Sequence, residues 1–589
     1  MSGDMDGERK LAAFRQGQGE LPDSYWLWPL YGAGIENLGR DGEPIEVPMP
    51  KMGPDELLIR HDAVGLCFSD VKVIKSGPEH PRIYGRDMEK EPVVLGHEVA
   101  LTVLRVGENL RGQYKPGDRF IMQADIYYQG VGMAYGYEIQ GGLSQYNVIG
   151  KEILDGDDGC YLIPVRPETG YAQAALTEPW ACVTASYDVV YRTGWKPGGV
   201  VLIAKGPAAA NAYSLGTPYA EGQPPAEVIT MGVDGALAEE LRQRAEQDGF
   251  ALVELKAASE ETLGEALSEA GDDGFDDVVF LGPDAALYEL LEPKTAIGAT
   301  LNLVGAEGLT EAVQVDVGRI HYDGLMLVGT TSSDLSQAYE PIRTELVPGG
   351  AAVFVGAAGP MGQMHVQRAL ESEEPPRLLV ATDLLQERLS VIAEKFAELI
   401  ERKSDQVELL LKVPGDTPPD AFNAGLVALT GGKGFDDVTV LAPSARVVAG
   451  AVDLLADGGA MNIFAGLTRG TRAPIDLSVV VERGIRFRGT SGSTISDLRS
   501  MLEYTESQRL NTNLSVDCIT GMRDVKKGID GVMHQQFEGK CVVYPLILDF
   551  PLTTLADLKT VLPKVYAKLG PNETWTVEAE EEFLKEMLP

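Results

Sequence analysis

Three short segments of the sequence contain the residue types that hold a transition metal. Cys67 opens the segment Cys-Phe-Ser-Asp, and His97 is followed directly by Glu98. Farther along, a Glu-Pro-Trp-Ala-Cys segment begins at Glu178 and ends at Cys182. A thiolate, an imidazole and a carboxylate suit zinc, and three protein ligands leave one position of a tetrahedral site open. Each residue alone is more often a core residue, but together with a nucleotide-binding pattern they indicate a catalytic zinc site.

That second pattern lies in AAVFVGAAGPMGQMHVQRAL, an apolar strand that leads through a glycine-rich turn into a helical stretch. Glycines are needed there because the turn is tight, the backbone must approach a pyrophosphate, and the helix must pack close to the strand. The start of the helix then offers free N–H groups and a positive dipole end to the anion. The turn residues expected to contact a dinucleotide are Gly356, Gly359, Pro360, Met361 and Gly362.

The next apolar stretch, RLLVAT, ends at Asp383, about twenty residues after the last glycine of the turn. A carboxylate at this position can accept hydrogen bonds from the hydroxyls of the adenosine ribose, and it would repel a 2′-phosphate. The sequence therefore predicts a dinucleotide site that prefers NAD to NADP. A glycine turn kept only for packing would not explain Asp383.

Two kinds of local pattern divide the chain. The first 190 or so residues contain short β-rich segments broken by Gly and Pro, such as DELLIRHDAVGLC and PVVLGHEVALTVLRVG, which predict a barrel-like, mostly-β unit. From Lys196 to about Glu506, apolar strands alternate with helical stretches rich in Ala, Leu and Glu. This alternation is typical of a parallel α/β architecture, so the expected fold class is α/β plus mostly-β.

A repeat runs through the α/β part. The segment Gly-Phe-Asp-Asp-Val at 274–278 recurs at 434–438, and Pro-Gly-Gly at 197–199 recurs at 348–350. The same register holds in Leu281/Leu441, Pro283/Pro443, Gly298/Gly458, Asn302/Asn462, Gly324/Gly484, Gly329/Gly489 and Thr330/Thr490. We therefore predict two homologous domains in tandem, 196–343 and 346–508, in preference to two unrelated segments that share a common turn.

The first copy departs from the second at the glycine turn. Aligning its Gly-Pro pair with that of the second copy puts Ile203 and Ala209 at two of the glycine positions. Aligning from Pro-Gly-Gly instead puts Lys205, Ala208 and Asn211 at all three. A Cβ is a steric obstacle where backbone must touch pyrophosphate. This copy is therefore expected to keep the fold and to have lost the cofactor.

Length and charge exclude several classes of protein. At roughly 150 residues per domain, 589 residues predict three or four units. The formal net charge of −38 would repel nucleic acid and anionic lipid, so neither is an expected partner. The low lysine content suits a high-salt cytoplasm but also occurs in ordinary acidic enzymes. Five scattered cysteines, no signal-peptide pattern and no long apolar run predict a soluble, cytoplasmic protein.

Several of these segments together resemble the medium-chain dehydrogenase/reductase superfamily, in particular its zinc-dependent alcohol and polyol dehydrogenases. The resemblance is carried by VGLCFSD, VVLGHEVALTVLRVG, YKPGDRF, GGLSQYNV, ALTEPWACV, KPGGVVLI, GAAGPMG and FEGKCVVYP. GAAGPMGQMHVQRAL and the C-terminal LPKVYAKLGPNETWTVEAEEEFL are similar to the sugar- and polyol-phosphate branch of L-sorbose-1-phosphate reductases. The resemblance implies a GroES-like catalytic domain over 1–195, completed by 509–589 with a helical extension. Two Rossmann-like, doubly wound domains, 196–343 and 346–508, would lie between these parts.

The resemblance also implies a set of zinc ligands. Cys67 and His97 match the first two catalytic ligands, and Glu178 matches the third ligand of the polyol branch. Glu98 matches a carboxylate that binds zinc directly or through water. Cys182 is a rival for the third position because it is a softer ligand one helical turn later.

Two further residues are expected to act on substrate and ligand. Ser69 matches the hydroxyl that passes the substrate proton toward solvent, and Asp70 resembles the carboxylate that orients the ligand histidine. The lobe that holds a structural zinc in many relatives, here GDRFIMQADIYYQGVGMAYGYEIQGG, contains no cysteine. One catalytic zinc and no structural zinc are therefore expected.

The resulting prediction is an NAD-linked oxidation of a secondary alcohol in a polyol, sugar or sugar phosphate, or the reverse reduction. A redox-neutral lyase or epimerase with tightly bound NAD is an alternative, and a binding or regulatory protein on a dehydrogenase fold is another. Homo-oligomers are possible. Within the chain, we expect the first copy to pair with the second as a built-in partner through one continuous sheet, which would cover exposed strand edges.

Overall fold

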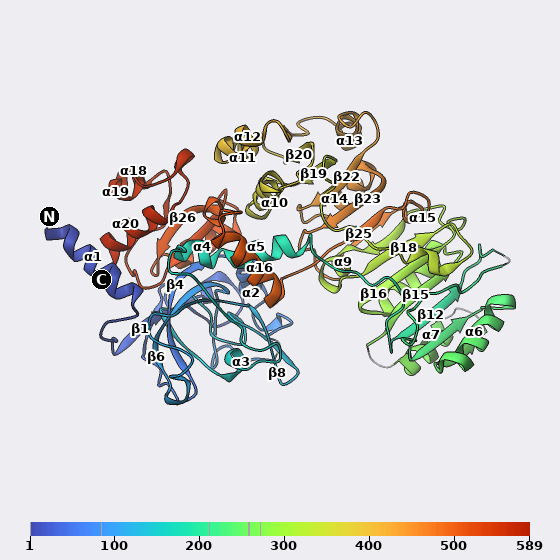
Figure 1. Ribbon diagram of the computed structural model, residues 1–589, viewed down its shortest axis with the longest axis horizontal. Coiled ribbons are helices and arrows are strands. Elements are labelled where there is room, and N and C mark those ends of the chain that lie inside the picture. The colour runs from blue at the N-terminus through green and yellow to red at the C-terminus, as the bar shows by residue number, and fades with distance from the viewer. Residues whose placement is uncertain (1, 84, 211, 257–259, 271–272) are drawn as a thin grey trace.

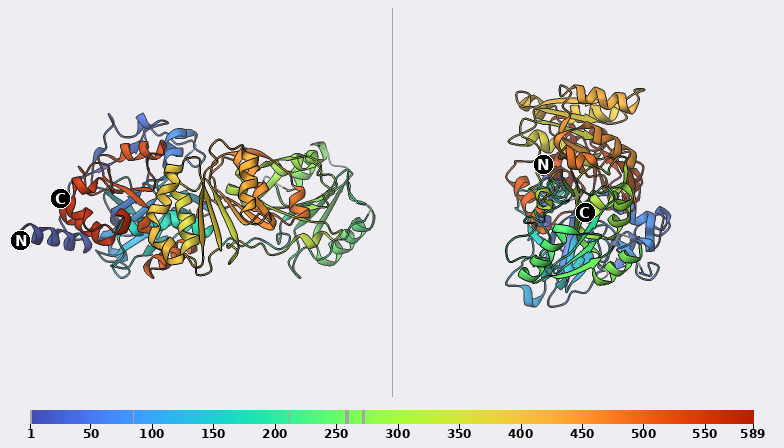
Figure 2. Two further views of the ribbon diagram at one scale, coloured as in Figure 1. Left: turned by 90° about the horizontal axis from the view of Figure 1, so that it is seen from above. Right: turned by 90° about the vertical axis from the view of Figure 1, so that its right-hand side faces the viewer.

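The computed structural model describes residues 2–83, 85–210, 212–256, 260–270 and 273–589, with the side chains of 2–4, 260, 261, 265, 269 and 270 left aside. The molecule is elongated: the β-rich part lies at one end and the first α/β copy at the other (Figures 1 and 2). Both termini lie at the β-rich end, where α1 (Ser2–Arg15) packs against α20 (Val577–Met587). Among the described residues, no helix is long and apolar enough to cross a membrane.

The β-rich end is built on an eight-stranded sheet to which both ends of the chain contribute. Its central strand β4 pairs antiparallel with β6 on one side and with the C-terminal strand β27 on the other. The strands are β4 (Leu57–Gly65), β6 (Glu98–Val106), β7 (Arg119–Met122), β10 (Tyr146–Ile149), β11 (Leu162–Pro164), β26 (Val516–Gly521), β27 (Lys540–Tyr544) and β28 (Thr553–Thr554). The last part of the chain thus completes a sheet that begins near the N-terminus.

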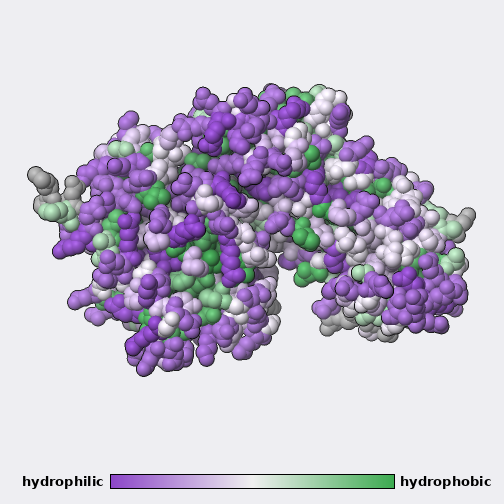
Figure 3. All heavy atoms as spheres, viewed as in Figure 1, coloured by the Kyte–Doolittle hydropathy of each residue, from purple (hydrophilic) through white to green (hydrophobic). Residues whose placement is uncertain are grey.

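Short elements surround this sheet. Three antiparallel pairs are β1 (Ser24–Leu27) with β3 (Ile45–Pro48), β2 (Pro29–Leu30) with β5 (Val93–Val94), and β8 (Asp125–Tyr128) with β9 (Val131–Ala134). The helices of this part include α2 (Phe68–Ser76), α3 (Lys151–Leu154), α4 (Tyr171–Ala175), α5 (Thr177–Ala185), α17 (Val525–Met533), α18 (Leu558–Val561) and α19 (Pro563–Tyr566). In the view of Figure 3 the surface is mainly hydrophilic, in keeping with the net charge of −38.

The two α/β copies form one twelve-stranded sheet. In spatial order the strands are β14 (Ala251–Leu255), β13 (Glu227–Met231), β12 (Val200–Lys205), β15 (Phe275–Leu281), β16 (Thr295–Val304), β18 (Met326–Thr330), β25 (Arg486–Arg488), β23 (Leu455–Ile463), β22 (Phe435–Val440), β19 (Ala351–Val355), β20 (Leu378–Thr382) and β21 (Glu408–Lys412). Strands within each copy are parallel, and the copies join through the antiparallel pair β18–β25.

Helices flank this sheet as the alternating pattern predicted. In the first copy they are α6 (Gly235–Asp248), α7 (Glu260–Ala270), α8 (Ala285–Leu291) and α9 (Val317–Asp323). In the second they are α10 (Pro360–Glu371), α11 (Gln386–Lys395), α12 (Ala397–Lys403), α13 (Pro419–Ala428), α14 (Ala445–Ala451), α15 (Ser478–Glu482) and α16 (Ile495–Glu506). The fold class predicted from the sequence, α/β plus mostly-β, is confirmed.

The register at the junction shows how the copies are related. In β18–β25, Leu327 pairs with Phe487. In a second antiparallel pair, β17 (Val313–Asp316) with β24 (Arg472–Ile475), Gln314 lies opposite Pro474. Both pairs join a residue to its own counterpart in the repeat, which is what a two-fold axis produces in a symmetric dimer. The expected continuous sheet is confirmed, and each copy covers a strand edge of the other.

The repeated Gly-Phe-Asp-Asp-Val segment has a structural role in both copies. Asp277 pairs with Arg192 at 2.9 Å, and Asp437 pairs with Arg343 at 2.6 Å. Each carboxylate also accepts a backbone N–H from the segment that leads into the first strand of its copy, at 2.9 Å in both cases. Because both carboxylates are buried, these ion pairs fix that segment to the neighbouring strand.

The first copy lacks the helix that should follow its glycine turn. In the second copy α10 begins soon after β19, but residues 206–210 and 212–226, which connect β12 to β13, form no helix. A Cβ on Gly282, at the end of β15, would lie 2.4 Å from Cα of Ala209, so the connection rests directly on the strand ends. Asn211 lies outside the described residues. That this copy binds no dinucleotide stays a prediction, now with a physical reason: in the described part of the connection after β12, no helix presents its N-terminus to a phosphate.

Candidate active site

Asp70 connects the segments that carry the first two predicted zinc ligands. Cys67 is the N-cap of α2, and its backbone N–H donates to Asp70 Oδ2 at 3.0 Å. The backbone N–H of Gly96 donates to the other oxygen, Oδ1, at 3.3 Å. His97 Nδ1 lies 3.4 Å from the same Oδ1. The buried carboxylate therefore joins the start of α2 to the turn before β6, which is the placement that an orienting role for Asp70 requires.

The structure brings Cys67, His97 and Glu98 together: their ligand atoms lie within 4.8 Å of one another. Burial alone would lower the pKa of His97, but Asp70 and Cys67 hold it well above its usual value. Glu98 Oε2 is buried without a hydrogen-bond partner among the described residues, and a bound cation would satisfy it. These residues fit a zinc ion.

Glu98 is held by a cation that the sequence analysis did not single out. Its Oε1 forms a buried ion pair with Lys540 of β27. Burial alone would lower the pKa of Lys540, but Glu98 raises it above its usual value. On β4, a Cβ at Gly65 would lie 2.0 Å from Glu98 Oε2, so only glycine leaves room for this carboxylate. Strand β27 thus places an ammonium group against the carboxylate that lies beside the cysteine and the histidine.

Glu178, expected as the third ligand, is not part of that set of ligand atoms. It lies in the first turn of α5, and the Cys182 thiol donates to its Oε1 at 3.7 Å. Burial raises the pKa of Glu178, with His97 opposing and Glu98 reinforcing the shift. Glu178 is therefore a second carboxylate near the same groups. Burial also raises the pKa of the Cys182 thiol well above its usual value.

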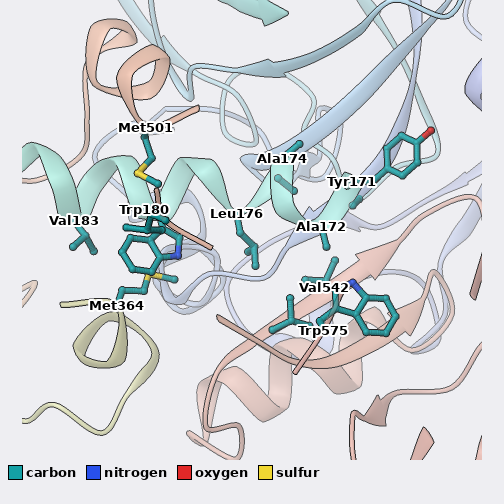
Figure 4. Packing of buried hydrophobic residues seen from close by; sticks show 14 of the residues in the cluster. Tyr171, Ala172, Ala174, Leu176, Trp180, Val183, Met364, Met501, Val542 and Trp575 are labelled. Carbon is teal, nitrogen blue, oxygen red and sulfur yellow. The ribbon is translucent and has the colours of Figure 1, made fainter. Parts of the chain in front are cut away.

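A buried core positions the helix that carries Glu178 (Figure 4). Trp180 projects from α5 between Met364 of α10 and Met501 of α16. Its indole Nε1 donates a hydrogen bond to Ser515 Oγ at 2.9 Å. All three apolar side chains are fully buried. Because α10 belongs to the second α/β copy, this packing fixes the metal-binding region relative to the glycine turn.

At each of the three glycine positions of the turn, a different structural reason favours glycine. Gly356 has a φ of 82°, a region that favours glycine. A Cβ on Gly362 would lie 2.4 Å from the carbonyl oxygen of Ala357, so α10 can pack against the turn only without one. A Cβ on Gly359 would meet only Arg388 within 4 Å, at 3.9 Å, so this surface is open to a ligand. These are the three roles that a dinucleotide turn needs.

The start of α10 lies at the same opening. Gly359 is its N-cap and Pro360 its first residue, a position that suits proline because no N–H bond is needed there. Pro360 and Met361 are both partly exposed. The free N–H groups and the positive dipole end of α10 therefore face a place where a phosphate can approach.

Asp383 lies beside this turn. It follows β20 directly, and its Oδ2 accepts a hydrogen bond from the backbone N–H of Ala358 at 3.2 Å. Its Oδ1 accepts from the N–H of Leu384 at 2.8 Å. Arg388, in α11, stands at the same opening, with Nε 3.7 Å from Glu538 Oε2. The carboxylate is thus placed where the sequence pattern expected a ribose partner.

The residues of this region differ in whether the sequence alone could have identified them. Ser69 lies in the first turn of α2 and is partly exposed, as a proton-transferring hydroxyl must be. Lys72, on the same helix, and Arg388, one helical turn or so after Asp383, could have been found from helical spacing. Lys540 could not, because its partner is 442 residues away.

Comparisons with known proteins agree with this geometry. Residues 53–154 match the family model described as alcohol dehydrogenase GroES-like domain. L-sorbose 1-phosphate reductase of Klebsiella pneumoniae is 22% identical over 542 residues, which cover 90% of this chain and 92% of that protein. Mannitol-1-phosphate 5-dehydrogenase of Aliivibrio fischeri is 28% identical over 318 residues, 50% of this chain and 73% of that protein. Residues 53–154 thus contain an alcohol dehydrogenase GroES-like domain, and almost the whole chain is similar to a sugar-phosphate reductase. The chain is an oxidoreductase.

A solved structure shares the fold. The crystal structure of 2R,3R-butanediol dehydrogenase from Bacillus subtilis is 15% identical with a TM-score of 0.50, and the alignment covers 88% of this chain and 99% of that one. The shared fold accounts for the joining of a β-rich part from both chain ends with an α/β part between them. The duplicated α/β copy is the feature that the sequence repeat revealed in addition.

Proposed function

We propose that this oxidoreductase is a zinc-dependent, NAD-linked dehydrogenase acting on the secondary alcohol, or the corresponding ketone, of a polyol, sugar or sugar phosphate. The observation that supports it most is the set of Cys67, His97 and Glu98, whose ligand atoms lie within 4.8 Å of one another. The names of the relatives, a mannitol-1-phosphate dehydrogenase and a sorbose 1-phosphate reductase, support the substrate class.

In this proposal Cys67 and His97 hold the zinc, and a carboxylate from Glu98 or Glu178 completes the protein ligands. Zinc, when bound there, supplies a Lewis acid that polarises the substrate oxygen and lowers the pKa of an alcohol. Asp70 orients His97, as its 3.4 Å separation from Nδ1 suggests. The hydroxyl of Ser69 accepts the substrate proton and passes it toward solvent.

The second α/β copy holds the dinucleotide in the proposal. Its pyrophosphate lies on the turn from Gly356 to Gly362 at the start of α10, and Asp383 accepts hydrogen bonds from the adenosine ribose. Because Asp383 also accepts N–H bonds from the turn and from its own strand end, its carboxylate is preorganised for this contact. The first copy binds no dinucleotide, so one NAD site per chain is expected.

The test combines metal analysis with turnover. Purified protein should contain one zinc per chain and should change the ultraviolet absorbance of NAD in the presence of a polyol, sugar or sugar phosphate. Cys67→Ser should lose zinc and activity together, whereas Cys160→Ser, a cysteine outside the set, should keep both. Glu98→Gln and Glu178→Gln identify the third ligand by which of them loses zinc. Full zinc content and turnover in Cys67→Ser would refute the proposal.

A further inference from the structure

Three parts of the chain meet at the ammonium group of Lys72. Lys72 lies on α2, the helix that begins at Cys67, and its Nζ donates a hydrogen bond to Tyr322 Oη at 2.8 Å. Tyr322 belongs to α9 of the first α/β copy. In the second copy, after β23, a Cβ at Gly466 would lie 2.9 Å from Lys72 Nζ and 3.2 Å from Tyr322 Oη. The metal-site helix and both copies therefore share one boundary.

Lys72 carries a positive charge that the described residues leave unpaired. It is partly exposed, and no carboxylate in the described part of the chain forms an ion pair with it, although the net charge of the protein is −38. Neighbouring Arg469, in contrast, pairs with Asp323 through its Nε at 2.7 Å. An ammonium group without a carboxylate partner in so acidic a molecule is available to an anion from solution.

A difference between the two copies of the repeat explains why the charge of Lys72 has no carboxylate partner in α9. Tyr322 occupies the position that Glu482 occupies in α15 of the second copy. A glutamate in α9 would neutralise Lys72, whereas the tyrosine hydroxyl only orients it. The Arg469 guanidinium carbon lies 5.2 Å from the centre of the Tyr322 ring and helps to hold that ring in place.

The charge of Lys72 acts on His80, whose ring neighbours the same tyrosine as the ring of His97. The ring of Tyr137 lies 6.1 Å from the ring of His97 and 5.5 Å from that of His80. Burial lowers the pKa of His80, and the positive charges of Arg82 and Lys72 act in the same direction. Arg82 is paired with Asp125, whereas the ion pairs found among the described residues do not include Lys72.

We propose that Lys72, oriented by Tyr322, binds the phosphate monoester of a substrate whose reacting carbon lies at Cys67 and His97. The inference rests on the proposed function and narrows its substrate class to phosphorylated polyols and sugars. An ammonium group forms charge-assisted hydrogen bonds with a phosphate dianion, and these are stronger than bonds to a neutral hydroxyl. The first copy, which has lost the nucleotide helix, thereby acts as a wall of the substrate site.

The test compares one hexitol with its 1-phosphate. In the wild type, kcat/KM should be higher for the phosphate. In Lys72→Met the ratio of the two kcat/KM values should fall by about tenfold to one hundredfold, mainly through the KM of the phosphate. Tyr322→Phe should lower the same ratio by about twofold to tenfold. Lys75→Met, which removes an exposed charge from the same helix, should leave the ratio unchanged.

A binding measurement separates this inference from the proposed function. Calorimetry with NADH present should show the affinity for the hexitol phosphate weakened in Lys72→Met by the same factor as the kinetic ratio. Equal losses with both hexitols, together with weaker NADH binding, would assign Lys72 to the cofactor and overturn the inference. If the wild type oxidises neither hexitol but binds the phosphate through Lys72, the proposed function fails, and phosphate binding by Lys72 is the part of the inference that stands.

Discussion

Asp383 gives the sharpest test of how the second α/β copy chooses its cofactor. In Asp383→Ser the hydroxyl can still accept the N–H of Ala358, which Asp383 Oδ2 accepts at 3.2 Å, so the glycine turn should keep its shape. What the variant loses is the negative charge beside the position expected for the adenosine ribose. We expect the preference of the enzyme to move from NAD toward NADP.

The magnitude follows from the contacts of the carboxylate. Hydrogen bonds to a charged group contribute about 1.5–3 kcal/mol each, so losing one ribose bond should weaken NAD binding about tenfold to one hundredfold. NADP gains because repulsion of its 2′-phosphate disappears and because Arg388 stands at the same opening, near Gly359. The ratio of the two affinities should therefore change by about one hundredfold or more.

The assay is fluorescence titration with NADH and NADPH, followed by kcat/KM for NAD and NADP. Asp405→Ser is a matched control, because Asp405 is exposed and precedes β21, at the opposite end of the strands from the turn. The control should bind both dinucleotides as the wild type does. A wild type that prefers NADPH, or an Asp383→Ser variant with unchanged preference, would refute the reasoning.

Two further predictions concern the same copy. Gly362→Ala should both destabilise the protein and weaken NADH binding, because the new Cβ would lie 2.4 Å from the Ala357 carbonyl oxygen. Gly359→Ala should weaken NADH binding without lowering the midpoint temperature of thermal unfolding. Equal midpoint temperatures for the two variants would contradict this. Burial raises the pKa of Glu371 to about 7, above its unfolded value of about 4.3, so the stability that its protonated form supplies is present below about pH 4 and lost as the pH rises through about 7. Glu371→Gln should therefore match the wild type in thermal unfolding at pH 4 and exceed it at pH 8 by about 3–4 kcal/mol. A difference that does not change with pH would disprove the assignment.

The sequence alone determined those features whose parts lie close together along the chain. Cys67 and Asp70 are within one turn of a helix, and Gly356 and Gly362 belong to a single strand–turn–helix unit. Such units are predictable because the backbone conformation of a few neighbouring residues places their groups. The repeat could be recognised for a different reason, because identical residues recur in the two copies at one constant spacing. It predicted the continuous sheet because equal copies can pair as equal subunits do.

Tertiary structure decided which distant groups meet. Glu98 and Lys540 are 442 residues apart, and Lys72 and Tyr322 are 250 apart. It also brought the ligand atoms of Glu98, Cys67 and His97 within 4.8 Å of one another. No local pattern encodes these contacts, because they depend on how β27 joins β4 and how the two copies pair through β18 and β25. Strands from remote segments pair because the whole core is buried together. Which side chains this pairing brings into contact is therefore decided only in the folded chain.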